Sequence, residues 1–514
     1  MPDNNPTPHG SGVRGLGYCP SSPLFEGRFG RIFRSLPEFS PKPTLAENEV
    51  LMRQLAEAMT AEHEPHTVQQ PDEIDGEENP SIPSGYTYFG QFIDHDLTFD
   101  PVSSLDKEND PDSLVNFRTP RFDLDCVYGR GPNDQPYMYE GSGKLIVGRN
   151  LTGSAFNPNA KDHQRSSNHR SIIGDPRNDE NVIVSQIHGL FIRFHNRLVD
   201  SGLSFDQAQL LTRWHYQYVV LNDFLPRIVG NAMVESVLPH FKPLGSHTIF
   251  EQPPKLRFYE PKQNSFIPVE FSVAAYRFGH SMVRPDYRLN EDDLTSLEIF
   301  NFANPSLGLN GFGEFPSSWA IDWGKYFELE NRPLTGKARI LPAYRIDCSL
   351  VNPLANLPKE HGMTPDMRNL TFRNLRRGLV MDLPSGQDVA RAMGETPLHD
   401  DQIFIGKATD DPTERQTITA AVPGLPAGQC PLWTYILAEA AHNLIHANGD
   451  TKKNVMGPVG GRIITETFIG LMLNDTHSFL SRDPNWNPKK ATYTGNPNKS
   501  DYKMPDFVRF ALGL

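Results

Sequence analysis

The stretch GQFIDHDLTFDP, residues Gly90–Pro101, carries more information about the fold than any other part of the sequence. Asp94, His95 and Asp96 follow one another inside an otherwise apolar segment. Burying an unpaired charge is costly, so each of these acids needs a partner if the segment is buried. The stretch therefore indicates either a functional site or an exposed turn with solvated charges.

A helical turn would divide these polar residues between two sites. At about 100° per residue, Gln91 and His95 lie on one face of the helix, with Asp94 beside them. Asp96 then points about 200° away from Asp94. One turn could therefore present Gln91, Asp94 and His95 to one site and Asp96 to another.

The stretch TPRFDLDCVYG, residues Thr119–Gly129, offers partners for Asp96. Thr119, Asp123 and Asp125 place hydroxyl and carboxylate oxygens at alternating positions, with backbone carbonyls between them. Hard cations such as calcium bind about six to eight such oxygens. The loop lacks the EF-hand pattern, and by itself it also fits an Asp-rich turn without a metal.

Two further motifs place chemically active side chains near predicted helices. In GDPRNDEN, Arg177 and Glu180 are three positions apart, just before a helical pattern that begins at Asn181. In AAYRFGHSMVRP, His280 stands among small and apolar residues. Taken alone, such a histidine is more often a hydrogen-bonded core residue than a ligand.

Composition narrows the range of partners. The chain has 514 residues, 38% of them hydrophobic, and a net charge of −13. This charge argues against nucleic acid and anionic membranes as partners. The polar N-terminus and the absence of a long apolar run predict no signal peptide and no membrane span, hence a cytoplasmic protein or export by a non-standard route. The four cysteines are far apart and are expected to be reduced thiols.

The pattern along the chain predicts a mainly α-helical protein with long loops and little β structure. Proline and glycine are abundant, with 45 and 40 residues, and strand-like alternation is scarce. Residues 1–80 are expected to form an extended arm that wraps the body, with one helix near Leu45–Thr60. Residues 81–514 are expected to form a single large domain.

These motifs occur together and in order, and the sequence resembles the peroxidase–cyclooxygenase superfamily of animal-type haem peroxidases, in a short bacterial form. The resemblance runs from about Gly15 to about Asp475. It rests on GQFIDHDLTFDP, TPRFDLDCVYG, GDPRNDENVIVSQIHGLFIRFHNRL and YRFGHSMVRP, followed by RNLRRG and GPVGGRIITETFIGL. It implies that residues 81–514 form a haem peroxidase catalytic domain.

The resemblance implies roles for two histidines and for the residues next to them. His95 matches the distal base, with Arg177 and Gln91 as its catalytic neighbours. His280 matches the proximal iron ligand, and Asn374 matches the asparagine that accepts the other N–H of that imidazole. A histidine of near-neutral pKa can move a proton between peroxide oxygens, and a fixed guanidinium can stabilise the leaving oxygen.

The resemblance also implies two cofactors, haem b and Ca²⁺. Asp94 and Glu180 match the acids that form ester links to the haem. Asn181 replaces the methionine that forms a third link in some relatives, so that link is not expected. The implied calcium ligands are Asp96, Thr119, Asp123, Asp125 and the carbonyl of Arg121. Many mammalian relatives have Ser at the position of Asp125, so this site carries an additional charge.

The implied function is reduction of hydrogen peroxide with oxidation of phenolic donors, halides or thiocyanate, as in a response to oxidative stress. The oligomeric state is open, with a monomer as the working expectation. One alternative is a fatty-acid dioxygenase of the same superfamily, whose radical tyrosine would occupy the position of Arg277; Tyr276 stands one residue earlier. A non-catalytic, calcium-stabilised binding protein is a second alternative. A zinc hydrolase has no HExxH motif to support it.

Overall fold

The computed structural model describes residues 28–63, 70–99, 118–152, 154, 156–239, 253–261, 264–292, 296–301, 303–357, 364–446, 453–488 and 502–514. Its helices are α1 (Leu45–Ala58), α2 (Gly85–Leu97), α3 (Asp125–Tyr128), α4 (Val182–Asp200), α5 (Phe205–Val219), α6 (Leu225–Val229), α7 (Asn231–Val237), α8 (Leu370–Val380), α9 (Gly386–Met393), α10 (Ile418–Ala421), α11 (Leu432–His446), α12 (Pro458–Asn474), α13 (Phe479–Arg482) and α14 (Met504–Leu512). The mainly helical fold expected from the sequence is confirmed.

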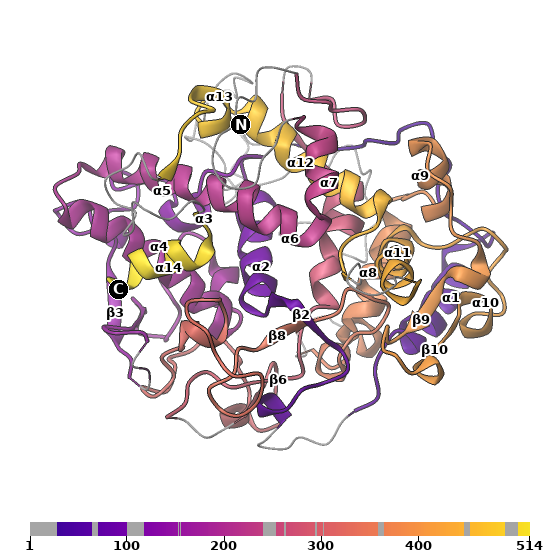
Figure 1. Ribbon diagram of the computed structural model, residues 1–514, viewed down its shortest axis with the longest axis horizontal. Helices are drawn as coiled ribbons and strands as arrows, with labels where there is room; N and C mark the ends of the chain where they lie inside the picture. Colours follow the sequence, from indigo (N-terminus) through magenta and orange to yellow (C-terminus); the bar gives the residue numbers. More distant parts are fainter. Residues whose placement is uncertain are drawn as a thin grey trace, which may run out of the picture.

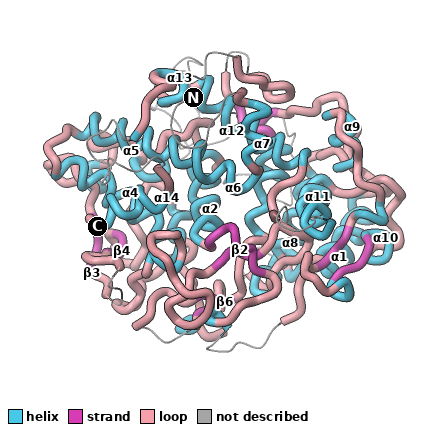
Figure 2. Tube along the Cα trace, viewed as in Figure 1, coloured by secondary structure: helices cyan, strands magenta, loops and turns pink. Residues whose placement is uncertain are grey.

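Short strands pair only in twos among the described residues. The antiparallel pairs are β2 (Glu78–Pro83) with β8 (Pro342–Tyr344), β3 (Val147–Asn150) with β4 (Lys161–His163), β6 (Asp286–Tyr287) with β7 (Leu297–Glu298), and β9 (Phe404–Gly406) with β10 (Arg415–Thr417). β1 (Arg28–Gly30) pairs with β5 (Phe266–Pro268) in parallel. The strands lie around the helices and form no continuous sheet (Figure 2).

α2, the helix that carries the GQFIDHDLTFDP motif, lies at the centre of the fold (Figure 1). α4, α5 and α14 lie to one side of it in this view, and α8, α11, α9 and α1 lie to the other. Phe92 of α2 stacks on Phe191 of α4, with ring centroids 4.4 Å apart, and Phe194 stacks on Phe507 of α14 at 4.1 Å. This aromatic packing buries one face of α2 and leaves its Gln91–His95 face for a site.

The start of α4 is fixed by local hydrogen bonds. The Asn181 side chain accepts from the backbone N–H groups of Ile183 and Val184, which is N-capping geometry. The short 3₁₀ helix η4 (Pro176–Asp179) precedes it and is capped by Asp175, whose carboxylate accepts from the backbone N–H of Arg177. The GDPRNDEN motif is therefore a rigid connection into α4.

The N-terminal segment is attached to the body at several points. Besides the β1–β5 pairing, the backbone N–H groups of Ile32 and Phe33 donate to the buried Glu270 carboxylate, over distances of 2.9–3.1 Å. The helix expected near Leu45–Thr60 is α1, which packs beside α8 through the Arg53 guanidinium over the Phe372 ring. Residues 1–27 lie outside the described residues, so the 1–80 arm and its boundary stay a prediction.

Within the described residues, no helix combines the length and the apolar character that crossing a membrane requires. Cys126, Cys348 and Cys430 are buried free thiols, as expected from the sequence, and Cys19 lies outside the described residues.

Candidate functional site

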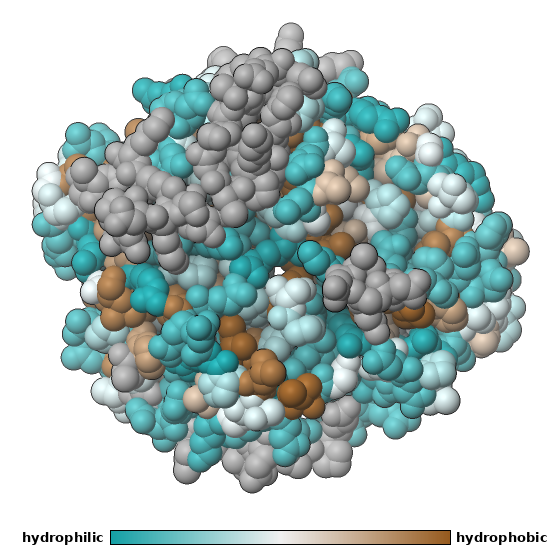
Figure 3. All heavy atoms as spheres, in the orientation of Figure 1, coloured by the Kyte–Doolittle hydropathy of each residue, from teal (hydrophilic) through white to brown (hydrophobic). Residues whose placement is uncertain are grey.

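A cavity of about 340 Å³ lies between α2 and α8. One group of lining residues comes from α2 and the segment that leads into α4: Gln91, Asp94, His95, Glu180 and Asn181. A second group comes from α8 and from the short helix η7 (Ala275–His280): Arg277, His280, Arg373, Asn374 and Arg377. The molecular surface is hollowed near the centre of the view in Figure 3, between the positions of α2 and α8 in Figure 1.

His95 is held in a fixed orientation by a buried asparagine. Its Nδ1 lies 2.8 Å from Asn178 Oδ1, and Asn178 Nδ2 lies 3.0 Å from His188 Nδ1. Because Asn178 Oδ1 can only accept, His95 Nδ1 carries a proton, and in the neutral tautomer Nε2 has its lone pair on the cavity side of the ring. Burial lowers the pKa of His188 well below its ordinary value, so His188 is neutral and can accept from Asn178.

Gln91 links α2 to the segment that leads into α4. Its amide nitrogen donates to Glu180 Oε1, and its carbonyl oxygen accepts from Asn181 Nδ2 at 3.2 Å. Glu180 Oε1 is also 3.6 Å from His95 Nε2. Burial raises the pKa of Glu180, and the nearby His95 and Arg177 act in the opposite direction. Asp94, one turn along the same face, lines the cavity as well.

His280 and Asn374 are in contact on the α8 side of the cavity. Asn374 Nδ2 lies 2.8 Å from His280 Nδ1, and Asn374 Oδ1 accepts from Arg277 Nη1 at 2.9 Å. The amide thus faces His280 with its nitrogen. The resemblance implies that Asn374 accepts an N–H from the His280 imidazole. For that role the amide has to turn over, so that its nitrogen faces Arg277 instead. Burial first, and then Arg277 and Arg373, lower the pKa of His280 to about 3, so the imidazole is neutral and able to bind a metal.

The charges around the cavity are segregated. Asp94 and Glu180 are the acids of its α2 side, whereas the guanidinium groups of Arg277, Arg373 and Arg377 belong to η7 and α8. Most of the remaining lining is aromatic or aliphatic, namely Tyr86, Tyr88, Tyr276, Phe278, Met282, Val283, Ile299, Phe300, Leu354, Leu357 and Leu370. Such a cavity suits a flat, largely apolar group with acidic substituents, since arginine pairs well with carboxylates.

Asp96 turns away from the cavity and meets two other acids. Ligand atoms of Asp96, Asp123 and Asp125 all lie within 4.8 Å of one another, and we call these three residues the acid cluster. Asp96 Oδ1 and Asp125 Oδ1 are buried without a hydrogen-bond partner. Burial and mutual repulsion raise the pKa of Asp96 well above its ordinary value, and burial raises that of Asp125 to about 7. Unpartnered carboxylate oxygens at this spacing fit a divalent cation.

The remaining predicted ligands lie in the same loop as the acid cluster. Thr119 Oγ1 donates to Asp123 Oδ2 at 2.6 Å, and the backbone N–H of Arg121 donates to the carbonyl of Thr119 at 2.8 Å. The described contacts do not bring the Arg121 carbonyl to the cluster.

Arg177 lies beside His95 but does not line the cavity among the described residues. Its Nη2 donates to the carbonyls of His95 and Thr98, at 3.0 and 2.6 Å, and pairs with Asp175 Oδ2 at 2.8 Å. The guanidinium lies over the Phe99 ring, 4.6 Å from its centroid. In this structure Arg177 therefore fixes the end of α2 rather than facing the cavity.

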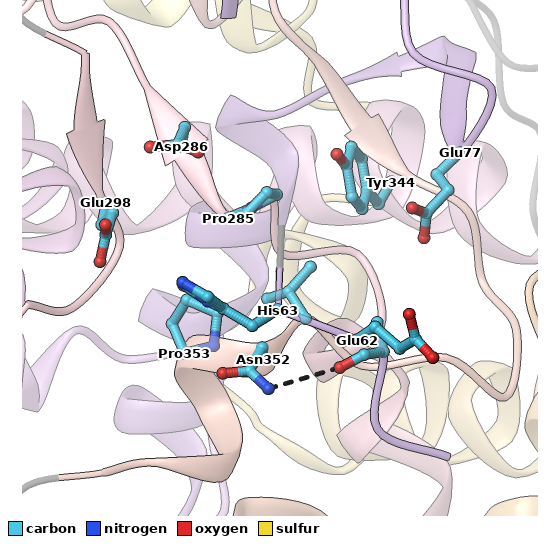
Figure 4. A pocket seen from close by; sticks show the side chains of 11 residues that line it. Glu62, His63, Glu77, Pro285, Asp286, Glu298, Tyr344, Asn352 and Pro353 are labelled. Atoms are coloured by element: carbon cyan, nitrogen blue, oxygen red, sulfur yellow. Dashed lines mark hydrogen bonds between the residues drawn. The ribbon is translucent and has the colours of Figure 1, made fainter. Parts of the chain in front are cut away.

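A second, much smaller hollow lies elsewhere, beside β8. Its volume is about 20 Å³, and its acids point apart, with Glu77 on one side and Glu298 on the other (Figure 4). Glu77 is paired with Lys407 Nζ at 2.6 Å. This hollow has neither the size nor the convergent polar groups of the large cavity.

Comparison with known proteins relates part of this chain to haem peroxidases. The family model "Animal haem peroxidase" matches residues 102–310. This match supports the resemblance to the peroxidase–cyclooxygenase superfamily that the motifs indicate. It is similar to chorion peroxidase of Aedes aegypti, with 29% identity over 154 residues, which is 27% of this chain and 18% of that protein. The chain thus spans less than a quarter of the length of that relative.

Solved structures of the superfamily share the fold. Peroxidase A of Dictyostelium discoideum superposes with a TM-score of 0.56 at 16% identity, covering 89% of both chains. Fatty acid alpha-dioxygenase of Arabidopsis thaliana superposes with a TM-score of 0.56 at 13% identity, covering 94% of this chain and 77% of that one. At such identities the likeness shows the fold alone, and it does not distinguish the two chemistries.

Sequence reasoning did not find three residues that the site depends on. Asn178 stands directly after Arg177. It is buried in the structure, and no sequence pattern marks it as buried. Asp175 and Arg118 are both buried, and their side chains meet across a gap of 57 positions in the sequence. No periodic pattern marks either of them, because the contact depends on how two loops pack.

Proposed function

We propose that this protein is a haem peroxidase that reduces hydrogen peroxide and oxidises small donors, with phenols, halides and thiocyanate as the candidate classes. The observation that carries the proposal is the presence of two histidines in one cavity, one on each side of it. His95 presents Nε2 from the α2 side, and His280 is available as an iron ligand from the η7 side. The resemblance to the superfamily gives the two histidines their chemical context.

The residues of the cavity fit haem b. His280 would bind the iron, with Asn374 against its second nitrogen. Arg277, Arg373 and Arg377 supply cations for acidic substituents, and Asp94 and Glu180 supply carboxylates for the two ester links. Haem bound there would supply the electron transfer between peroxide and donors, which protein side chains alone do not provide.

His95 is the proton carrier in this proposal. Its Nε2 takes a proton from the incoming hydrogen peroxide and returns it to the oxygen that leaves as water. By accepting from Nδ1, Asn178 places the lone pair of the neutral imidazole on Nε2. Gln91 and Glu180 border the same space, and their hydrogen bond joins α2 to the segment that leads into α4.

Calcium is proposed as a structural ion at the acid cluster, bound by Asp96, Asp123 and Asp125 with oxygens of Thr119 and Arg121. Three carboxylates this close together, one buried and two half-buried, would otherwise repel one another. Because Asp96 directly follows His95, a fixed Asp96 also fixes the catalytic turn of α2.

The deciding experiment compares two reactions of the purified, haem-containing protein. Guaiacol oxidation by hydrogen peroxide should be rapid, and oxygen uptake with linoleate should be absent. The spectrum should show a Soret band in the native protein. Oxygen uptake without guaiacol oxidation would establish the dioxygenase instead. Failure to bind haem would favour the calcium-stabilised binding protein.

A further inference from the structure

Arg118 is a buried cation between two carboxylates of different segments. Its side chain is 2% exposed, Nη1 lies 3.2 Å from Asp125 Oδ2, and Nη2 lies 2.5 Å from Asp175 Oδ2. Nη2 also donates to the carbonyl of Gly174 at 3.4 Å. Asp125 belongs to the acid cluster and Asp175 to the segment that leads into α4. The planar guanidinium is the side chain best suited to bridge two such carboxylates.

Asp175 continues this connection to the end of α2. Its carboxylate is fully buried and is shared, since Oδ2 also pairs with Arg177 Nη2 at 2.8 Å. Arg177 in turn donates to the carbonyls of His95 and Thr98. A continuous series of contacts therefore runs from Asp125 through Arg118, Asp175 and Arg177 to the backbone of His95.

One aromatic ring packs against both guanidiniums of the series. The Phe99 centroid is 5.5 Å from the guanidinium carbon of Arg118 and 4.6 Å from that of Arg177. Phe99 comes from the same stretch as His95, so the two cations contact the catalytic segment through its backbone and through this ring. Cation–π contacts of this kind are stronger when desolvated.

The acid at position 125 contributes to the balance of charge around the proposed calcium ion. The acid cluster and Asp175 contribute four carboxylates, and Arg118 and Arg177 contribute two cations. The two remaining negative charges match one divalent cation. Asp125, which gives the cluster its additional charge, is the member that contacts Arg118.

We propose that Arg118 is a positioning residue that connects the calcium site to the distal catalytic segment. The inference rests on the proposed function, because it requires calcium at the acid cluster and peroxide chemistry at His95. Loss of Arg118 should therefore be measured at both places, the acid cluster and the distal segment.

The effects of Arg118→Gln on the two sites should have opposite signs. The substitution removes a cation that competes with calcium for Asp125. Calcium should therefore bind at least as tightly as in the wild type, and we expect a gain in affinity of about threefold or more. Asp175 then loses one of its two cations and Arg177 is held less firmly. The bimolecular reaction of the holoprotein with peroxide should therefore slow by about tenfold.

The experiment measures both quantities on the holoprotein, with calcium binding followed by equilibrium dialysis and the peroxide reaction by stopped-flow absorbance. The wild type is measured first, and a wild type that bound no calcium or did not react with peroxide would refute the proposed function itself. With an active wild type, a slower reaction without weaker calcium binding supports the role of Arg118. Weaker calcium binding, or an unchanged reaction, overturns it.

Two further variants separate positioning from general damage. Arg332→Gln removes another buried guanidinium, 3% exposed and 2.9 Å from Asp322, and should leave both quantities within about twofold. Arg118→Lys keeps the charge but cannot bridge both carboxylates. It should bind calcium within about twofold of the wild type and still react more slowly, and it answers the question if Arg118→Gln does not fold. Wild-type values for Arg118→Lys in both assays would also overturn the proposal.

Discussion

Asn178 Oδ1 lies 2.8 Å from His95 Nδ1, and this contact determines which nitrogen of His95 can act as a base. Asn178 is fully buried, and its amide nitrogen is engaged by His188, so the amide has a defined direction. A neutral imidazole that donates from Nδ1 has its lone pair on Nε2. The orientation of one asparagine therefore sets the tautomer of the histidine that we propose as the catalytic base.

Asn178→Leu should slow the peroxide reaction while leaving the haem content unchanged. Leucine removes the acceptor for Nδ1, so the fraction of His95 with the correct tautomer falls. We expect a loss of about tenfold or more, against about 10²-fold or more for His95→Ala, the usual scale for losing acid–base assistance. Stopped-flow mixing with peroxide measures both. A wild-type rate in Asn178→Leu would show that the contact is not needed.

His280→Ala should abolish stable binding of haem or leave a haem without normal peroxidase activity. The neutral imidazole is the proposed iron ligand, and no other histidine lines the cavity on the η7 side among the described residues. The Soret spectrum and guaiacol turnover report on the two effects. His442→Ala is a matched control, since His442 lies on α11 outside the cavity lining. An unchanged spectrum and turnover in His280→Ala would exclude it as the ligand.

Much of this site could be predicted from one short segment because a helix fixes the directions of neighbouring side chains. The placement of Gln91 and His95 on the cavity, and of Asp96 toward Asp123 and Asp125, follows from helical geometry. These relationships are local along α2.

Relationships between segments distant in the chain could not be predicted in the same way. The resemblance implies a catalytic role for Arg177, whereas in this structure its guanidinium pairs with Asp175, two positions earlier, and with the carbonyl of His95. Arg118 directly precedes the predicted calcium loop, yet its contact with Asp175 depends on loop packing. Side-chain direction outside regular helices is decided by such packing, which sequence periodicity does not report.

Removal of calcium should lower the thermal stability of the protein. Elemental analysis should find about one calcium per chain, since the described residues form one cluster of this kind. An ion bound only by the native state stabilises it by mass action, so the unfolding midpoint should rise with calcium concentration after exhaustive chelation. Full activity and an unchanged midpoint without any bound divalent ion would count decisively against the site.

Stability should also depend on pH through Glu439. Burial raises the pKa of this carboxyl from 4.5 to about 8 in the folded protein, where it accepts from the backbone N–H of Val459 at 3.0 Å. Between these values the folded state keeps a proton that the unfolded state has released, so stability falls as pH rises. A pKa difference of one corresponds to about 1.4 kcal/mol.

The matching measurement compares unfolding midpoints of wild type and Glu439→Gln at several pH values between about 5 and 8. Glutamine does not titrate, so the variant should lose less stability across this window. All other groups are common to both proteins and cancel in the comparison. Equal slopes would mean that Glu439 titrates in its ordinary range.

The final prediction concerns covalent attachment of the haem through Asp94 and Glu180. Both side chains line the cavity, from α2 and from the segment that leads into α4. Esterification of a haem methyl with a carboxylic acid requires a two-electron oxidation, and hydrogen peroxide supplies it by leaving as two waters. Each ester removes a carboxylate charge from a partly desolvated position and fixes the haem relative to His95. Recombinant protein should therefore be partly linked, and mild peroxide treatment should complete the reaction.

Extraction with acid and butanone tests this attachment directly. Haem should stay on the peroxide-treated wild type, whereas Asp94→Val combined with Glu180→Gln should release it. Each single variant should retain haem through the remaining acid. Asn181 cannot form a sulfonium bond, so the Soret band should be less red-shifted than in a relative with three links. If the peroxide-treated wild type gives up all its haem, the two acids are ordinary cavity residues that contribute charge and hydrogen bonds but no covalent bond.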